Sequence, residues 1–147
     1  MATTSGTVYQ FSPTDHIHLT PYLAALHAAC VSNDRTIATF LPPLTQEKLL
    51  AFWKERIAEV NAGTRCMFIL VDEPQPGGRI LGTQLMGVVM LLMPPSETGP
   101  MRGIVEKLLV STRFRRRGGA RALMQALEAE ALARGKSLLV SFWCPSR

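Results

Sequence analysis

Five arginines gather around a pair of glycines in the last third of this 147-residue chain. The segment consists of Arg113, Arg115, Arg116, Arg117, Gly118, Gly119, Ala120 and Arg121. A guanidinium group matches the oxygen atoms of a phosphate in both geometry and charge. Glycine lacks a Cβ atom, so a ligand can approach the backbone closely at Gly118 and Gly119. The segment therefore predicts a site for a phosphate-bearing ligand.

The elements on either side of this turn would position it. Leu108, Leu109 and Val110 precede the turn and favour a strand. A helix is predicted over residues 118–134, with Gly135 as its C-cap. Its apolar stripe consists of Ala120, Leu123, Met124, Leu127 and Ala131. Because the first N–H groups of a helix lack intrahelical acceptors, a strand–turn–helix arrangement directs backbone donors at a phosphate.

Other interpretations of the arginine cluster remain open at this point. Such clusters are also typical of solvated surfaces, nucleic-acid binding and nuclear import, and a strand–Gly–helix junction can be a plain tight connection. A P-loop is excluded because no Gly-Lys-Ser/Thr follows, and the GxGxxG dinucleotide motif is absent. A nucleic-acid-binding module using Phe114 is disfavoured, because the arginines are confined to one turn without an aromatic platform.

The pattern Arg115-x-x-Gly118-x-Ala120 follows Glu106-x-x-x-Val110 and precedes an amphipathic helix. This arrangement resembles the acetyl-CoA signature of the GNAT N-acetyltransferase superfamily. That signature reads Gln/Arg-x-x-Gly-x-Gly/Ala, and this chain matches it at each signature position. Within the superfamily, the Val-Glu-Lys-Leu-Leu-Val strand and its turn resemble small-molecule acetyltransferases of the tabtoxin-resistance type.

The resemblance implies a GNAT-like α+β fold, in which helices flank a mixed, mainly antiparallel twisted sheet in three layers. It also implies acetyl-CoA as co-substrate, with the pantetheine arm paired to strand backbone and the pyrophosphate held by the turn. The residues implied in cofactor binding are Leu108, Leu109, Val110, Arg115, Arg116, Arg117, Gly118, Gly119, Ala120 and Arg121. Asp34 and Phe40 are implied in an acceptor pocket, for which a solvated loop is the alternative interpretation.

The implied reaction is direct transfer of an acetyl group to a primary amine of a small molecule. An amine attacks only in its neutral form, so a base must take its proton, and a backbone N–H would stabilise the oxyanion. Glu106 is the candidate catalytic base, because family members often place a carboxylate at this position. The alternative is a strand carboxylate paired with Lys107 or an arginine. We expect Lys107 to be a poor partner, because neighbours along a strand face opposite sides.

Composition is compatible with this interpretation. A chain of this length fits one domain, 47% of its residues are hydrophobic and only 18% are charged, which excludes a disordered chain. The net charge of +5 suits an anionic ligand. Cys30, Cys66 and Cys144 show no metal-ligand spacing, so we expect buried, reduced thiols, no metal and a cytoplasmic location. The N-terminus lacks the features of a secretory signal, and the longest apolar run, 85–93, is too short to span a membrane.

Periodicity and turn residues predict strand, two helices, three strands, helix, strand. A first strand is expected over residues 8–11, and Thr20 and Pro21 are expected to start a helix as N-cap and first-turn residue. A loop is expected over residues 32–44, and Thr45 is expected to cap the second helix. The remaining strands are predicted at 65–71, at 80–93 with a bulge near Gly82 or Gly87, at 103–111 and at 137–143.

Other residues that could carry chemistry have simpler predicted roles. We expect surface or capping roles for His16, His18 and His27, because no metal-ligand spacing accompanies them. Phe52 and Trp53 lie on a helix stripe and are predicted to be core. The methionines predicted to fill gaps in the core are Met67, Met86, Met90 and Met93.

The sequence departs from the family after the fifth strand. Relatives continue with another helix and two further strands. That helix often carries a tyrosine that protonates the leaving thiolate. We therefore expect residues 1–147 to form a single domain that is incomplete at its C-terminus. An open edge at the fifth strand would favour a homodimer. A catalytically impaired CoA-binding protein is the alternative function, and a nucleic-acid-binding module is less favoured.

Overall fold

The computed structural model describes residues 6–34, 46–72, 80–93, 102–111, 118–136 and 138–141. At 31–34, 102 and 138–141 it describes the backbone but not the side chains. The elements are β1 (Gly6–Gln10), η1 (Ile17–Leu19), α1 (Thr20–Asp34), α2 (Gln46–Ala62), β2 (Arg65–Asp72), η2 (Gly82–Gln84), β3 (Leu85–Leu92), β4 (Arg102–Val110), α3 (Gly119–Ala133) and β5 (Leu138–Ser141), where η marks a short 3-10 helix. The predicted order of strands and α-helices is confirmed.

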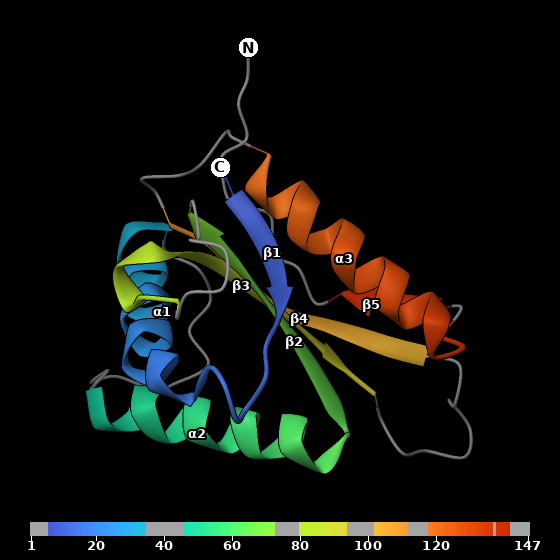
Figure 1. Ribbon diagram of the computed structural model, residues 1–147, viewed down its shortest axis with the longest axis horizontal. Coiled ribbons are helices and arrows are strands. Elements are labelled where there is room, and N and C mark those ends of the chain that lie inside the picture. The colour runs from blue at the N-terminus through green and yellow to red at the C-terminus, as the bar shows by residue number, and fades with distance from the viewer. Residues whose placement is uncertain are drawn as a thin grey trace.

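The strands form one sheet in the order β1-β2-β3-β4-β5. The first three pairings are antiparallel, and β4 pairs with β5 in parallel through α3. This arrangement confirms the predicted GNAT-like α+β fold with a mixed, mainly antiparallel sheet. Helices α1 and α2 lie on one side of the sheet and α3 lies on the other (Figure 1), so the predicted three layers are present.

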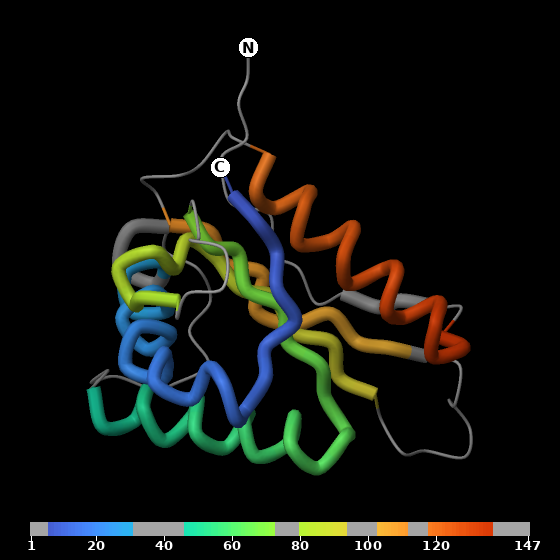
Figure 2. Tube along the Cα trace, in the orientation of Figure 1, coloured from blue at the N-terminus to red at the C-terminus, as the bar shows by residue number. Residues whose placement is uncertain are grey.

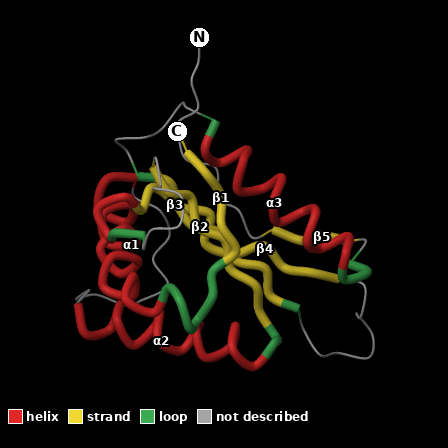
Figure 3. The backbone as a smooth tube through the Cα atoms, viewed as in Figure 1, coloured by secondary structure: helices red, strands yellow, loops and turns green. Residues whose placement is uncertain are grey.

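Each face of the sheet carries its own hydrophobic core. The first core joins α1 and α2 to the sheet around Leu23 and Trp53, both fully buried. The second joins α3 to the opposite face through Leu123 and Leu127. Strands β2 and β3 are buried on both faces, which explains their continuous apolar sequences. Figure 3 shows the two helical layers in red on either side of the yellow strands.

The path of the chain explains this layering. α1 and α2 follow one another before the chain enters the centre of the sheet at β2, as the blue-to-green part of the tube in Figure 2 shows. α3 instead connects the parallel strands β4 and β5, and a parallel connection requires such a crossover. The layers are therefore set by the order of the elements.

Three local expectations are wrong. Thr20 is not the N-cap of α1, because η1 precedes it and its hydroxyl donates to the Ile17 carbonyl at 2.6 Å. α1 continues to Asp34, beyond the expected start of the loop at residue 32. The strand expected over 80–93 begins only at Leu85, because η2 occupies Gly82–Gln84.

The bulge expected in this strand is present beside Gly87. The β2–β3 register shifts between Leu70, which pairs with Gly87, and Val71, which pairs with Leu85. A Cβ at Gly87 would lie 2.8 Å from the Leu109 carbonyl oxygen, so the close approach of β3 to β4 requires glycine here.

The two ends of α3 follow the sequence expectation. Gly118 is the N-cap and Gly135 lies just beyond the C-terminus, both with positive φ, at 78° and 77°. The Lys136 N–H donates to the Ala131 carbonyl at 2.8 Å, which closes the helix as glycine C-caps do. The buried stripe contains Gly119 in place of the expected Ala120, which is exposed.

Leu127 and Leu132 on α3 test the second core as a matched pair, because they are 0% and 72% exposed. We expect Leu127→Ala to lower the free energy of unfolding by about 2–5 kcal/mol, since a cavity remains in a packed core. Leu132→Ala should change it by no more than about 0.5 kcal/mol. Urea titration followed by circular dichroism measures both, and equal losses would contradict the assigned face of α3.

Candidate functional site

An extra residue interrupts the pairing of β4 with β3. Met90 pairs with Glu106 and Val88 pairs with Leu109, so two steps along β3 match three steps along β4. Lys107 lies at this point with a φ of +56°, in the left-handed region that non-glycine residues rarely adopt. β4 therefore contains a β-bulge centred on Lys107, and bulges redirect side chains next to functional sites.

The bulge changes which way the side chains of β4 point. Leu108 and Val110 pack on the α3 side of the sheet, whereas Leu109 belongs to the core under α1 and α2. Glu106 and Lys107 both reach the α2 side, because Glu106 binds Arg65 and the Lys107 ammonium lies 5.5 Å from the centre of the Phe52 ring. The expectation that neighbours 106 and 107 face opposite sides is therefore wrong.

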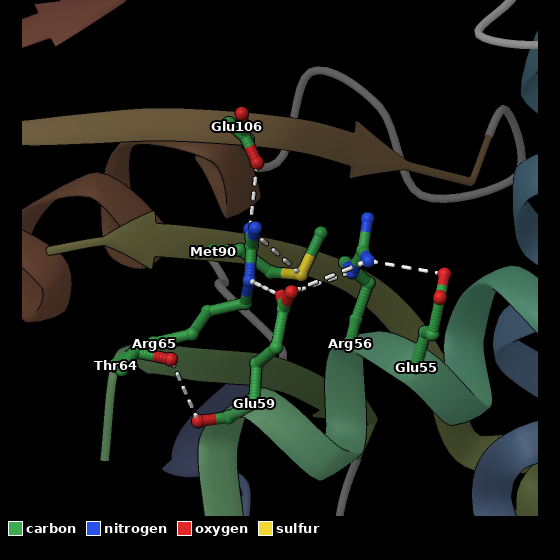
Figure 4. A network of polar contacts seen from close by, with 7 residues as sticks. All are labelled: Glu55, Arg56, Glu59, Thr64, Arg65, Met90 and Glu106. Carbon is green, nitrogen blue, oxygen red and sulfur yellow. Dashed lines mark hydrogen bonds and ion pairs between the residues drawn. The ribbon is translucent and has the colours of Figure 1, made fainter. Parts of the chain in front are cut away.

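Glu106 forms an ion pair with an arginine from two strands away. The Arg65 Nη1 atom lies 2.6 Å from Glu106 Oε1, and the Arg65 Nε atom lies 2.7 Å from Glu59 Oε1 on α2 (Figure 4). Arg65 is 4% exposed at its side chain, whereas Glu106 and Glu59 are 34% and 37% exposed. The alternative in which Glu106 pairs with an arginine is thus present, and that arginine is Arg65.

Lys107 lies in a partly apolar environment formed by α1 and α2. Burial lowers the pKa of Lys107, Arg56 and Arg65 lower it further, and Glu106 opposes the shift. The ring of Phe52 carries a second cation, since the Arg56 guanidinium carbon lies 4.9 Å from its centre. Lys107 therefore belongs to the same charged cluster as Glu106.

His27 lies on α1 where it packs against α2, and it is only 2% exposed. The surface or capping role expected for it is therefore wrong. Its ring contacts Phe52 and Trp53 at centroid distances of 5.6 and 5.8 Å. Burial, with a smaller contribution from Lys107, lowers the pKa of His27 to about 4. His27 is therefore neutral at pH 7 and part of the core.

The other two histidines contact backbone groups, His16 locally and His18 far along the chain. The Ser12 N–H donates to His16 Nδ1 at 2.9 Å, which supports the turn before α1. His18 Nε2 lies 2.6 Å from the Ile80 carbonyl oxygen, across 62 residues of sequence. These contacts agree with structural roles.

The end of β4 offers a backbone carbonyl on the side away from β3. The Ser111 N–H donates to the Met86 carbonyl on β3 at 2.7 Å. Because a trans peptide points its C=O and N–H in opposite directions, the Val110 carbonyl faces away from β3. One contact of this carbonyl is the Cys30 Sγ at 3.7 Å, a weak donor.

In the described chain, β5 does not extend along this part of β4, which is paired with β3 alone. β5 is aligned with β4 only from Arg102–Leu138 to Val105–Ser141. The bulge and the Val110 carbonyl lie beyond the last of these pairs. Among the described residues, β4 thus has a strand partner on both sides only at 104–105.

The first N–H groups of α3 have no acceptor within the helix. The Ala122 N–H makes a helical hydrogen bond to the Gly118 carbonyl at 3.0 Å. The N–H groups of Gly119, Ala120 and Arg121 precede it in the helix and have no intrahelical acceptor. A Cβ at Gly118 would meet nothing within 4 Å, so the surface is open there.

The two glycines at this helix start have different roles. Gly118 is needed for its left-handed φ. A Cβ at Gly119 would lie 2.7 Å from Leu70 Cδ2, so the close approach expected of a ligand at Gly119 is taken by β2. A role of Gly119 in binding an anion would therefore rest on its N–H group.

Several predicted site residues lie outside the described residues. Arg115, Arg116, Arg117 and Phe40 are among them. Asp34 is described only as the last residue of α1, without its side chain. The structure brings Leu108, Leu109 and Val110 together on the strand that leads to this turn.

The sequence did not single out Arg65 or Glu59, and it considered Lys107 only as a partner for Glu106. Arg65 opens an apolar strand, and a charge at the start of a buried strand needs a partner, which was the available signal. Nothing in the sequence named Glu106 as that partner, because 41 residues separate the two.

As predicted, the cysteines in the described part of the chain and the gap-filling methionines are buried. Cys30 and Cys66 are buried free thiols, and burial raises the pKa of Cys66. The predicted gap-filling methionines Met67, Met86, Met90 and Met93 are all buried. Cys144 lies outside the described residues.

Within the described ranges, no group of three or more His, Cys, Asp or Glu side chains is arranged to hold a metal ion. No helix in the described part of the chain combines the length and apolarity that crossing a membrane requires.

Comparison with known proteins gives a family match. Residues 33–145 match the model of the acetyltransferase (GNAT) family. No curated protein sequence matches the chain. The matched region contains the β4 bulge, the Arg65 ion pairs and the start of α3.

Solved structures share the fold at low identity. A predicted acetyltransferase from Clostridium acetobutylicum, solved with acetyl-CoA, is 12% identical, with 97% of this chain and 82% of that chain covered and a TM-score of 0.62. An aminoglycoside N-acetyltransferase solved with CoA is 16% identical, with 98% and 80% covered and a TM-score of 0.64. An N-acetyltransferase from Staphylococcus aureus Mu50 is 18% identical, with 92% and 72% covered and a TM-score of 0.65.

His27 should make stability depend on pH. Because its folded pKa of about 4 lies below the ordinary value of 6.5, the unfolded chain binds a proton between these values that the folded chain does not. The free energy of unfolding should therefore fall by about 3 kcal/mol as pH drops from 6.5 to 4. Urea titrations at several pH values should show a shallower fall in His27→Gln, and identical slopes would contradict a buried neutral His27.

Proposed function

Because the chain belongs to the acetyltransferase (GNAT) family, we propose that it transfers an acetyl group from acetyl-CoA to a primary amine of a small molecule. The observation that carries this proposal is the open start of α3, placed directly after β4 in a fold shared with acetyltransferases. Family membership supports acetyl transfer in general. The small-molecule amine is the further step that this proposal takes.

The start of α3 fits the diphosphate of acetyl-CoA. The N–H groups of Gly119, Ala120 and Arg121 lack intrahelical acceptors, and such groups bind phosphate at helix N-termini. The open space at Gly118 admits a phosphate close to the backbone. Arg115, Arg116 and Arg117 enter the proposal from the sequence alone, as cations beside the diphosphate.

The backbone of Leu108, Leu109 and Val110 would hold the pantetheine arm. The Val110 carbonyl faces away from β3 towards its weak contact with the Cys30 thiol, so an amide N–H can replace that contact with a stronger hydrogen bond. The described pairing with β5 ends before these residues. An extended amide chain would thus add to β4 in the manner of a strand.

Acetyl-CoA supplies the acetyl group as a thioester, which an amine can attack directly. The chain's part is to hold the amine and take its proton, for which Glu106 is the proposed base. Arg65 binds Oε1 of Glu106 and leaves Oε2 outside that ion pair. At 34% exposure, the carboxylate remains accessible to an amine or a water molecule.

The proposal also covers the acceptor contacts, the extent of the domain, the cellular location and the oligomeric state. Asp34 and Phe40 are proposed to contact the amine, and similar structures include an aminoglycoside N-acetyltransferase. We propose that residues 1–147 belong to one domain that acts in the cytoplasm, where Cys30 and Cys66 stay reduced. A homodimer through an edge of the sheet is a further proposal.

A second candidate function is CoA binding without turnover. It is favoured by the ion pair at Glu106, because one oxygen of the proposed base is already occupied. Thiol release measured with a panel of amines separates the two functions. Binding of acetyl-CoA without thiol release for any amine would support the second.

Gly118 and Gly135 provide a matched test of the acetyl-CoA site. Both have positive φ and open surroundings, but they lie at opposite ends of α3. Gly118→Glu should weaken acetyl-CoA binding at least about tenfold, because a carboxylate would face the diphosphate, whereas Gly135→Glu should change it less than about twofold. Calorimetric titration measures both, and equal affinities in the two variants would place the site elsewhere.

Glu106→Gln tests the proposed base. Loss of general-base catalysis should lower kcat by about 10²–10⁴-fold, with acetyl-CoA affinity retained. Glu55→Gln is the control, because Glu55 lies on α2 with its side chain 75% exposed and its ion pair in the described part of the chain is with Arg56. Thiol release at saturating acetyl-CoA gives kcat, and an unchanged value in Glu106→Gln would remove Glu106 from the reaction.

A further inference from the structure

Arg65 connects three strands of the sheet with α2. It is the first residue of β2, its side chain passes Met90 on β3, where Nη1 lies 3.8 Å from the sulfur, and it ends at Glu106 on β4. Its Nε atom at the same time binds Glu59 on α2. Figure 4 shows the guanidinium between these two carboxylates.

Burial makes these contacts obligatory for Arg65. The side chain is 4% exposed, and a buried guanidinium is stable only when carboxylates and hydrogen bonds replace its water. Its planar group donates from Nε and Nη1 in fixed directions, so both carboxylates are held at defined positions. Arg65 therefore fixes the distance between α2 and the bulge of β4.

The two carboxylates differ in how fully they are bound. Glu59 is contacted through both oxygens, because Arg56 lies 3.0 Å from Oε1 and 3.3 Å from Oε2. Glu106 has only its Oε1 atom in the Arg65 ion pair, and it lies beside the bulge. This asymmetry makes Glu59 an anchor for Arg65, and it makes Glu106 the carboxylate with an oxygen to offer.

We propose that Arg65 is a positioning residue, which Glu59 anchors and which orients the Glu106 carboxylate so that Oε2 receives the proton of the acceptor amine. This inference rests on the proposed acetyl transfer with Glu106 as base. Arg65 touches neither the amine nor acetyl-CoA, and it acts through Glu106 alone. Its loss should therefore affect kcat much more than substrate binding.

The test compares Arg65→Met with Arg134→Met in the full chain. Arg134 is a control matched in its contacts, because it also lies 2.6 Å from a carboxylate, that of Glu130, and 3.9 Å from a methionine sulfur. It lies at the end of α3, and its side chain is 39% exposed. Arg65→Met should lower kcat by about 10–100-fold, as expected for a misplaced catalytic group, with KM for the amine within about threefold. Arg134→Met should keep the native kcat.

A double-mutant cycle distinguishes positioning from a general structural effect. Because Arg65 acts through Glu106, Arg65→Met combined with Glu106→Gln should be no slower than Glu106→Gln alone. Multiplying losses would overturn the proposal, because Arg65 would then act independently of Glu106. Calorimetric titration should give the same acetyl-CoA affinity in each variant, and a parallel loss of affinity would also overturn it.

Arg65→Lys covers the case in which Arg65→Met fails to fold. Lysine keeps the charge but lacks the two-directional fork, so it should recover only part of the rate. Full recovery would show that charge alone suffices and would overturn the positioning role.

Failure of the further inference is distinct from failure of the proposed function. If Glu106→Gln is slow and Arg65→Met is native-like, only the role of Arg65 is wrong. If Glu106→Gln is native-like, or if the native chain binds acetyl-CoA but acetylates no amine, the catalytic proposal fails and the role of Arg65 fails with it.

Discussion

The extra residue at Lys107 is the constraint on which the geometry of the site depends. A regular strand would direct residues 106 and 107 to opposite faces, but the left-handed backbone at Lys107 directs both to the layer of α1 and α2. A positive φ at a lysine is costly, and the packing of β4 between the two cores maintains it. The side chains of Glu106 and Lys107 thus lie on the α2 side of the sheet, while those of Leu108 and Val110 pack on the α3 side.

The charges on this side of the sheet are paired within the fold. Buried Arg65 pairs with both Glu106 and Glu59, and Arg56 adds a second cation to Glu59. The cluster links β2, β4 and α2, which are distant in sequence, so the position of the proposed base depends on the sheet as a whole. The proposed cofactor contacts depend instead on a local feature, the open helix start at Gly118.

The sequence predicted those parts of the structure that local physics controls. Hydrophobic periodicity gave the order of the strands and α-helices, and the glycines at 118 and 135 marked the ends of α3. It failed where a distant contact decides the outcome. η2 replaces the first part of the expected third strand, and His27 is buried among aromatic side chains that its spacing in α1 does not reveal.

The candidate site divides along the same line. The residue types of the glycine–arginine turn and the preceding strand determined the family resemblance, because donors at a helix start are a property of consecutive residues. Only the tertiary structure decided that Gly119 packs against Leu70, that the backbone bulges at Lys107 and that Arg65 crosses β3 to reach Glu106. The physical reason is that register and burial arise from pairing between strands, and a sequence lists neighbours along the chain only.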